Sequence, residues 1–216
     1  ENLDVGKVIG KDMIGPVSLR TGIQATLSKP ASLKIDSLFV DRLHFNSYDY
    51  SGLKAVGLLA ENMFNGTIIA NDPSLNAWLQ GGFALSAKTH NARYKFYANI
   101  EDADLNALNI DKRGRSKIRF STNANFTKRE NGNILGDIDI ADLRFTNRDS
   151  TTNIGNINLT SHSSDNVYKM RLRSQFAEGS FNGTAPITQF AKDLISLTAG
   201  AELPALFVSE ADKWKE

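Results

Sequence analysis

Apolar and polar residues alternate with a period of two along most of residues 1–185. In a β-strand, successive side chains point to opposite faces of the sheet, so this period predicts strands with one apolar and one polar face. The clearest examples are residues 17–27, 94–100, 118–126 and 168–176. In each of them one phase is mainly hydrophobic, and the other is mainly Lys, Arg, Asn, Gln, Ser or Thr.

Turn-forming residues separate these segments. Asn131-Gly132 is the strongest hairpin signal, because Asn-Gly favours the tight turns that join antiparallel strands. The apolar phase slips by one residue between Ile140 and Leu143, which predicts a β-bulge or a tight bend. No helical interval separates the strands, so we predict an all-β fold of hairpin-linked antiparallel strands rather than crossover units.

The period changes after residue 185. Hydrophobic residues then recur at the spacing of one face of an α-helix. Pro186 suits the first helical turn, and Gly200 suits the end of the helix. We predict that this C-terminal amphipathic α-helix lies within a segment at 186–208, followed by a polar tail at 209–216. The helical stripe consists of Ile187, Phe190, Ala191, Leu194 and Ile195.

Composition excludes several classes of protein. The charge is nearly balanced, with 25 Lys and Arg against 24 Asp and Glu, so we expect no nucleic-acid partner. Cys is absent, which excludes disulfides and a cysteine nucleophile. No segment approaches the roughly 18 consecutive apolar residues of a membrane-spanning helix.

The chain begins at Glu1 rather than Met, and we expect it to be an excised part of a longer protein.

Candidate catalytic and metal-binding residues are scattered. His44, His90 and His162 lie in three different strand or turn contexts and lack the paired spacing of metal ligands. Asp-X-Asp segments at 102–104 and 137–139 place two carboxylates on one strand face, but lack the other ligands that a cation requires. We therefore expect no enzymatic activity, no catalytic residues, no metal and no cofactor.

Trp78 and Tyr97 are candidates for a sugar-stacking platform on a β-sheet face. Aromatic residues are favoured in strands for their packing alone. We therefore prefer the interpretation that both side chains pack in the core.

The strongest functional signal is collective. One helix cannot cover the apolar faces of so many strands. Either two sheets close face to face as a sandwich, or one strongly curled sheet encloses an apolar groove. The expected lining positions of such a groove are Leu19, Ile23, Phe96, Ile100, Ile118, Phe120, Phe126, Ile138, Ile140, Met170, Leu172 and Phe176.

Two segments of the chain are nearly identical: AENMFNGTI at 60–68 and AEGSFNGTA at 177–185. An internal repeat of this kind indicates recurring structural units. We predict that both copies contain a strand ending in Ala-Glu, an inward-facing aromatic residue and an Asn-Gly turn before Thr.

A series of short segments occurs in a recognisable order between about residue 5 and about residue 200. They are YDYSGL at 48–53, AENMFNG at 60–66, NDPSL at 71–75, GGFAL at 81–85, YKF at 94–96, ADLNALNI at 103–110, ANFT at 124–127, NILG at 133–136, RSQFAE at 173–178 and FNG at 181–183. As an ordered set they resemble the TamB family, specifically its large members from Bacteroidota, which are similar to AsmA-like bridge proteins.

The resemblance implies a long curled antiparallel sheet, or β-taco, over 1–185, with 186–208 as a helical cap or insertion. It implies a noncatalytic periplasmic segment of a protein anchored in the inner membrane of a Gram-negative bacterium. The implied partners are phospholipid acyl chains in the groove and, through other parts of the protein, an outer-membrane barrel assembly partner of the TamA or BamA type. The implied roles are phospholipid transport between the two membranes, outer-membrane protein assembly, or both.

Two alternatives remain open from the sequence. One is a closed β-sandwich that acts as an adhesive or glycan-binding module. The other is a chaperone surface that pairs an open sheet edge with client strands.

Overall fold

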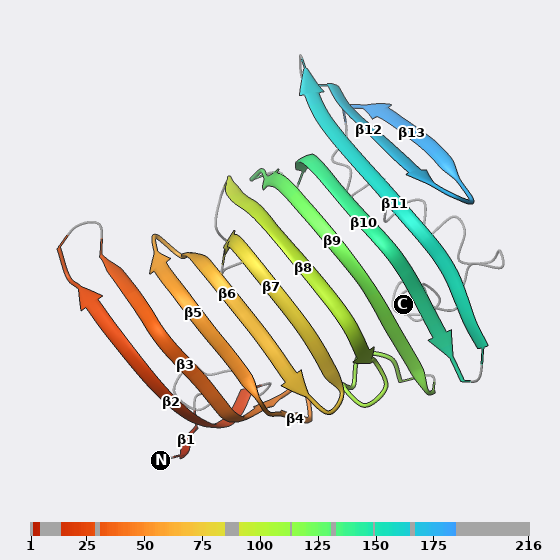
Figure 1. Ribbon diagram of the computed structural model, residues 1–216. Helices are drawn as coiled ribbons and strands as arrows, with labels where there is room; N and C mark the ends of the chain where they lie inside the picture. The colour runs from red at the N-terminus through yellow and green to blue at the C-terminus, as the bar shows by residue number, and fades with distance from the viewer. Residues whose placement is uncertain are drawn as a thin grey trace, which may run out of the picture.

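A single antiparallel β-sheet forms the described part of the chain (Figure 1). The computed structural model describes residues 2–4, 14–28, 31–84, 91–112, 114–130, 133–148, 150–164 and 167–184. The predicted all-β antiparallel fold is confirmed over these residues. The predicted helix, the segment 186–208 and the tail 209–216 lie outside the described residues.

The 13-stranded sheet is a meander in which each strand pairs with the next one along the chain, except that β4 and β5 both pair with β3. The strands are β1 (Asn2–Asp4), β2 (Ile14–Thr26), β3 (Ser32–Phe45), β4 (Tyr48–Tyr50), β5 (Leu53–Ala60), β6 (Met63–Asp72), β7 (Leu75–Ala84), β8 (Ala92–Asp104), β9 (Ser116–Lys128), β10 (Ile134–Asn147), β11 (Ser150–Ser164), β12 (Val167–Ser174) and β13 (Glu178–Gly183). The short β4 and the longer β5 pair with successive parts of the same edge of β3.

The sheet is open, because its order begins with β1 and ends with β13 and these two strands do not pair. The alternative of a closed two-sheet sandwich is therefore wrong for the described residues. Meander connections explain this outcome, since each hairpin adds the next strand to the growing edge and does not start a second layer.

Bulges bend several long strands near their middle. Register shifts occur between Ile35 and Leu38 in β3, and between Ile100 and Ala103 in β8. In β10 the register against β11 shifts between Ile140 and Leu143, which confirms the predicted slip. An extra residue in one strand bends that strand and increases its local twist, so these bulges curve the sheet.

The β8–β9 connection folds onto one end of the apolar face. Leu105 and Leu108 of this connection form a buried cluster with Ala103, and the exposed fraction of Leu108 is only 2%. The partly buried hydrophobic residues packed against this cluster are Tyr48, Tyr50, Leu75, Ile100, Ile118 and Phe145.

The same connection contacts the turn between β3 and β4. The Asn46 side-chain amide donates to the Asn109 carbonyl oxygen at 3.1 Å, and the Asn109 amide donates to the Asn46 carbonyl oxygen at 3.0 Å. Because β5, β6 and β7 lie between these two elements in the sheet, the β8–β9 connection reaches across the ends of three strands.

Shortening Leu108 tests how strongly this connection is anchored. We expect Leu108→Ala to lower the free energy of unfolding by about 3 kcal/mol, because the side chain is buried and would leave a cavity. Ile110→Ala is the matched control, since Ile110 lies in the same connection but is 61% exposed, and it should change stability by less than about 0.5 kcal/mol. Urea unfolding measures both values, and equal losses would contradict the assigned packing.

The two nearly identical segments do not form the predicted turns. Asn65-Gly66 lies inside β6 and Asn182-Gly183 inside β13. The turn before β6 is made instead by Glu61 and Asn62, both with positive φ. Only the first copy has a strand that ends at Ala60, because Ala177 precedes β13.

What the two copies share is an aromatic ring packed over a glycine two residues later. A Cβ on Gly66 would lie 2.8 Å from Cζ of Phe64, and a Cβ on Gly183 would lie 2.6 Å from Cζ of Phe181. Residues i and i+2 of a strand share a face, so the ring covers the surface that glycine leaves bare. The Phe-Asn-Gly sequence is therefore a packing motif within a strand.

Candidate functional site

The apolar face of the sheet is the candidate functional site. Cross-strand partners in an antiparallel sheet point to the same face, so the register identifies which residues lie side by side. One continuous row of partners runs from β2 to β13 and contains only apolar residues and glycines. In order, it is Ile23, Ile35, Gly57, Gly66, Gly81, Phe96, Ala124, Ile138, Leu159, Leu172 and Gly179.

A second row lies beside the first on the same face. It runs Thr21, Leu38, Ala55, Ile68, Leu79, Ala98, Thr122, Ile140, Ile157 and Ser174. Its polar members carry only hydroxyl groups, and the Thr122 hydroxyl donates to the Asp139 carbonyl oxygen at 2.9 Å. The two rows contain no charged side chain.

The register places the predicted lining residues on this one face, with the exception of Phe176. Leu19 is the cross-strand partner of Val40, Phe120 is the partner of Ile100, and Ile118 is the partner of Ala103. Phe126 is the cross-strand partner of Tyr94, and the two rings stack at a centroid distance of 4.7 Å. Met170 pairs with Phe181 of β13. The others, Ile23, Phe96, Ile100, Ile138, Ile140 and Leu172, belong to or adjoin the rows above.

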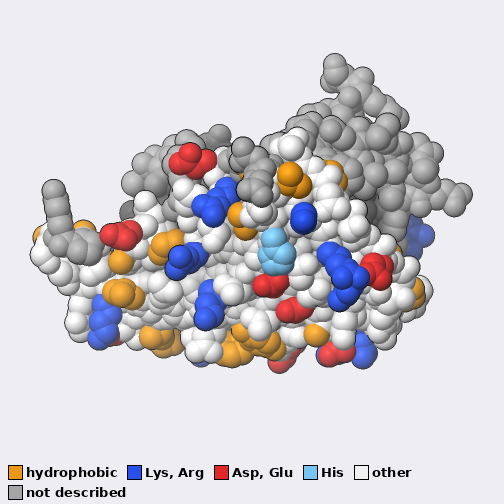
Figure 2. Space-filling model, turned by 90° about the horizontal axis from the view of Figure 1, so that it is seen from above, with side chains coloured by type: hydrophobic (Ala, Val, Ile, Leu, Met, Phe, Trp, Pro, Cys, Tyr) orange, Lys and Arg blue, Asp and Glu red, His pale blue; other side chains and the backbone are white. Residues whose placement is uncertain are grey.

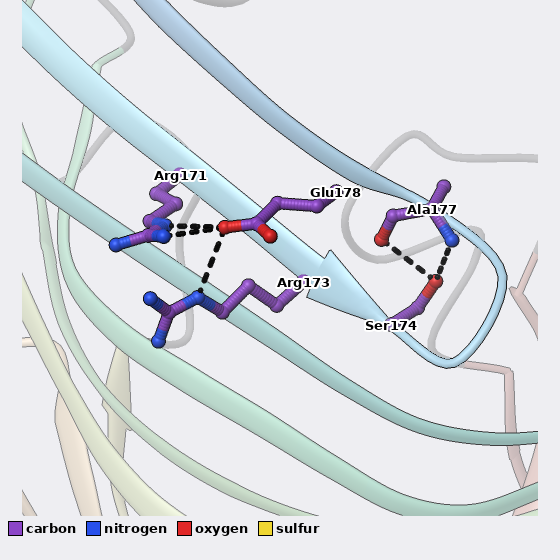
Figure 3. A network of polar contacts seen from close by, with 5 residues as sticks. All are labelled: Arg171, Arg173, Ser174, Ala177 and Glu178. Carbon is purple, nitrogen blue, oxygen red and sulfur yellow. Dashed lines mark hydrogen bonds and ion pairs between the residues drawn. The ribbon is translucent and has the colours of Figure 1, made fainter.

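The prediction that Phe176 lines this face is wrong. Phe176 lies in the turn between β12 and β13 and is 72% exposed. The Ser174 hydroxyl accepts a hydrogen bond from the backbone N–H of Phe176 at 3.2 Å. It also accepts one from the backbone N–H of Ala177 at 3.0 Å and donates to the Ala177 carbonyl oxygen (Figure 3). These bonds end the strand at Ser174 although the alternation of residue types continues.

A hollow of about 320 Å³ lies on the apolar face between β3 and β8. Tyr50 and Leu75 line it and also pack against the β8–β9 connection, so this connection bounds one end of the hollow. Its remaining lining residues are Leu43, Phe45, Leu53, Ile68, Ala70, Ala77, Leu79, Ala98 and Ile100. The apolar face therefore contains a hollow. One end of this hollow is bounded by the β8–β9 connection, which is distant in sequence from β3 and β4.

Asp72 is a buried carboxylate at this end of the apolar face. It accepts hydrogen bonds from the Tyr48 hydroxyl at 2.6 Å, from the Ser51 backbone N–H at 2.8 Å and from the Ser74 backbone N–H at 2.8 Å. Burial acts to raise the pKa of Asp72, but these hydrogen bonds outweigh it and hold the pKa below its usual value. The Asp72 carboxylate thus links β4, the residues between β4 and β5, and the β6–β7 turn through these hydrogen bonds.

The opposite face of the sheet is polar and carries exposed ion pairs. Arg20 pairs with Asp41 at 2.8 Å, Lys117 with Asp102 at 2.7 Å, and Glu178 with Arg171 and Arg173 (Figure 3). Each such exposed pair contributes little to stability. Positive and negative side chains are intermixed on the side of the molecule shown in Figure 2, without a large field of one sign.

The candidate catalytic and metal-binding residues are not brought together in the described part of the chain. His44 contacts Asp49 at 2.7 Å, His162 is exposed on β11, and His90 lies outside the described residues. Asp139 accepts a hydrogen bond from Asn158 at 2.6 Å. Within the described ranges, no three His, Asp or Glu side chains are grouped so that they could hold a metal ion.

Core packing is the wrong interpretation for Trp78 and Tyr97. The register places them on the polar face, where they are 37% and 40% exposed and where their ring centroids lie 5.4 Å apart. Period-two alternation identifies the two faces of a strand, but it does not show that an aromatic residue in the polar phase stays in contact with solvent.

The fold and the site define an open, curled antiparallel sheet whose apolar face is not covered by a second sheet in the described part of the chain. Among these residues no helix has the length and apolar character needed to cross a membrane. Comparison with protein-family models, with curated proteins and with solved structures gives no match to this chain.

Proposed function

We propose that this chain is a noncatalytic, TamB-like segment whose apolar face forms a groove for phospholipid acyl chains. In this proposal it lies in the periplasm as part of an inner-membrane-anchored protein and carries phospholipid between the inner and outer membranes. The observation that supports this most strongly is the row of apolar residues that continues from β2 to β13 without a charged side chain.

The geometry suits a mobile apolar ligand. Each methylene buried against the face contributes on the order of 0.8 kcal/mol, and this contribution needs no specific headgroup contact. Neighbouring strands are about 4.8 Å apart, so a chain that moves along the rows exchanges one set of apolar contacts for a similar set at every strand. Without a charged group in these rows, no position holds the ligand much more tightly than the next.

A second role, in outer-membrane protein assembly with a barrel partner, is favoured by the free edge of the sheet. Among the described strands, β13 is paired on one side only, with β12. An unpaired strand edge can accept an additional strand from another chain. Assembly is thus a second candidate function for the same fold.

A charge placed in the middle of the groove tests lipid binding. We expect the purified wild-type chain to carry phospholipid in native mass spectrometry and Ile138→Lys to lose it, because a lysine there would interrupt the apolar row. Asn125→Lys is the matched control, since Asn125 is exposed on the opposite face of the adjacent strand and pairs in register with Asp137. This control variant should retain its lipid.

Circular dichroism first establishes that each variant keeps its β-sheet, and Phe120→Lys provides a second substitution on the apolar face. Unchanged lipid content in folded Ile138→Lys and Phe120→Lys would overturn the groove. So would an equal loss of lipid in Asn125→Lys.

A further inference from the structure

The polar face contains a second and larger hollow, of about 870 Å³, whose lining also includes Gly66, Gly81 and Phe96 of the first apolar row. Four of its lining residues, Thr67, Gln80, Tyr97 and Asn123, are register partners on the adjacent strands β6, β7, β8 and β9. Their side chains therefore form a continuous polar and aromatic line across the sheet. The volume falls in the range of about 300–1,000 Å³ that is typical of small-ligand sites.

Gly82 is one of the lining residues of the hollow and lies beside Asn65. In the register it lies between Asn65 of β6 and Lys95 of β8, where any other residue would place a side chain on the polar face. A Cβ on Gly82 would lie 2.3 Å from Oδ1 of Asn65. The Asn65 side-chain amide therefore lies over Gly82, in the space that a side chain at position 82 would occupy, and it lines the hollow.

The amide groups at this site are available to a ligand. Asn65, Gln80 and Asn123 are exposed, and none has a side-chain hydrogen-bond partner among the residues that the structure describes. Other amides on the sheet are occupied: Asn76 donates to Glu101 at 2.7 Å and Asn158 to Asp139 at 2.6 Å. Each free amide offers both donors and an acceptor, as the hydroxyl groups of a sugar also do.

Aromatic surface completes the site. Tyr97 lines the hollow, and its ring contacts the ring of Trp78 at a centroid distance of 5.4 Å. Trp78 and Tyr97 each expose more than a third of their residue surface, on the polar face of the sheet. Aromatic rings have a flat apolar body, which matches the C–H faces of pyranose rings.

We propose that this hollow binds a carbohydrate chain of β-linked pyranose units. Sugar rings lie against Tyr97 and Trp78, and the hydroxyl or acetamido groups bond to Asn65, Gln80 and Asn123. An extended β-linked chain fits best, because the partners follow one line across four strands. The side chains that contact the sugar lie on the face opposite the apolar groove, so carbohydrate binding does not depend on lipid binding.

Calorimetric titration of the purified chain with chitohexaose and with cellohexaose tests the proposal. We expect at least one of these β-1,4-linked probes to bind, and Tyr97→Ala to weaken that binding at least tenfold. Gln80→Ala, which removes an amide from the same line, should weaken it by a smaller factor.

Phe39→Ala is the matched control, because Phe39 is an exposed aromatic residue of β3 that does not line the hollow. Binding by this variant should equal that of the wild type. The proposal is overturned if neither probe binds the folded wild-type chain, or if Tyr97→Ala and Phe39→Ala bind equally well. Ile138→Lys should retain carbohydrate binding, which separates this result from the lipid experiment.

Discussion

Gly66→Val is expected to lower the free energy of unfolding by about 4 kcal/mol, an exceptional loss for a surface-facing strand position. A Cβ at Gly66 would lie 2.1 Å from the Val56 carbonyl oxygen and 2.7 Å from Cα of Gly57. It would also lie 2.8 Å from Cζ of Phe64. Two of these three contacts are with backbone atoms of the neighbouring strand, which cannot move aside without breaking the pairing of β5 with β6.

Gly179→Val is the matched control for this substitution. Gly179 is also a strand glycine in the same apolar row, but no atom lies within 4 Å of the position that its Cβ would take. Valine favours strands, so this variant should be as stable as the wild type or slightly more stable. Urea unfolding at neutral pH measures both variants. Similar stabilities for the two would show that the close approach of β5 and β6 is not what requires glycine at position 66.

Glycines of three adjacent strands meet in the first apolar row. Gly57, Gly66 and Gly81 are direct cross-strand partners, so three adjacent strands present no side chain at this level of the row. The ring of Phe64 packs over both Gly57 and Gly66. At β5 and β6 the Phe64 side chain therefore supplies the apolar surface that the two glycines lack.

Much of the apolar face could be predicted because, in a meander, the period-two pattern of each strand determines which residues of neighbouring strands lie on the same face. When each strand pairs with the next through a short turn, the phase of one strand fixes the phase of its neighbour. Ile138 and Leu172 therefore share a face although they lie in different strands, and alternation alone was sufficient to place them there. The bulge in β10 was predictable for the same reason, since a bulge shifts the phase within one strand.

The failures have local physical causes that residue type does not reveal. At Phe176 the alternation continues, but the Ser174 hydroxyl captures two backbone N–H groups and forms a turn. The anchoring of the β8–β9 connection depends on the contact between Asn46 and Asn109, which are far apart in the sequence. The polar hollow combines residues of β6, β7, β8 and β9, a long-range arrangement that the spacing within one strand does not predict.

Removing the Asp72 carboxylate is expected to lower the free energy of unfolding by about 4 kcal/mol at pH 7. In Asp72→Ala the Tyr48 hydroxyl and the backbone N–H groups of Ser51 and Ser74 lose their acceptor. A donor left without a partner away from water costs about 1–3 kcal/mol, and these three donors are partly buried. Asp137→Ala is the matched control, since Asp137 is an exposed carboxylate on the polar face, and it should change stability by less than about 0.5 kcal/mol.

The pH dependence of this difference tests whether the ionised form of Asp72 is responsible. The pKa of Asp72 is lower in the folded chain than in the unfolded chain, where it is about 3.9. Its stabilising contribution is therefore complete above about pH 4 and is lost as the pH falls through the folded-state pKa. The stability difference between wild type and Asp72→Ala should be constant from pH 7 to about pH 5 and should shrink below about pH 4. Asp41, Asp49 and Glu178, whose pKa values are also lowered, occur in both proteins and cancel from the difference. A difference that stays constant or grows on acidification to pH 3 would mean that an ionised Asp72 does not hold this end of the sheet together.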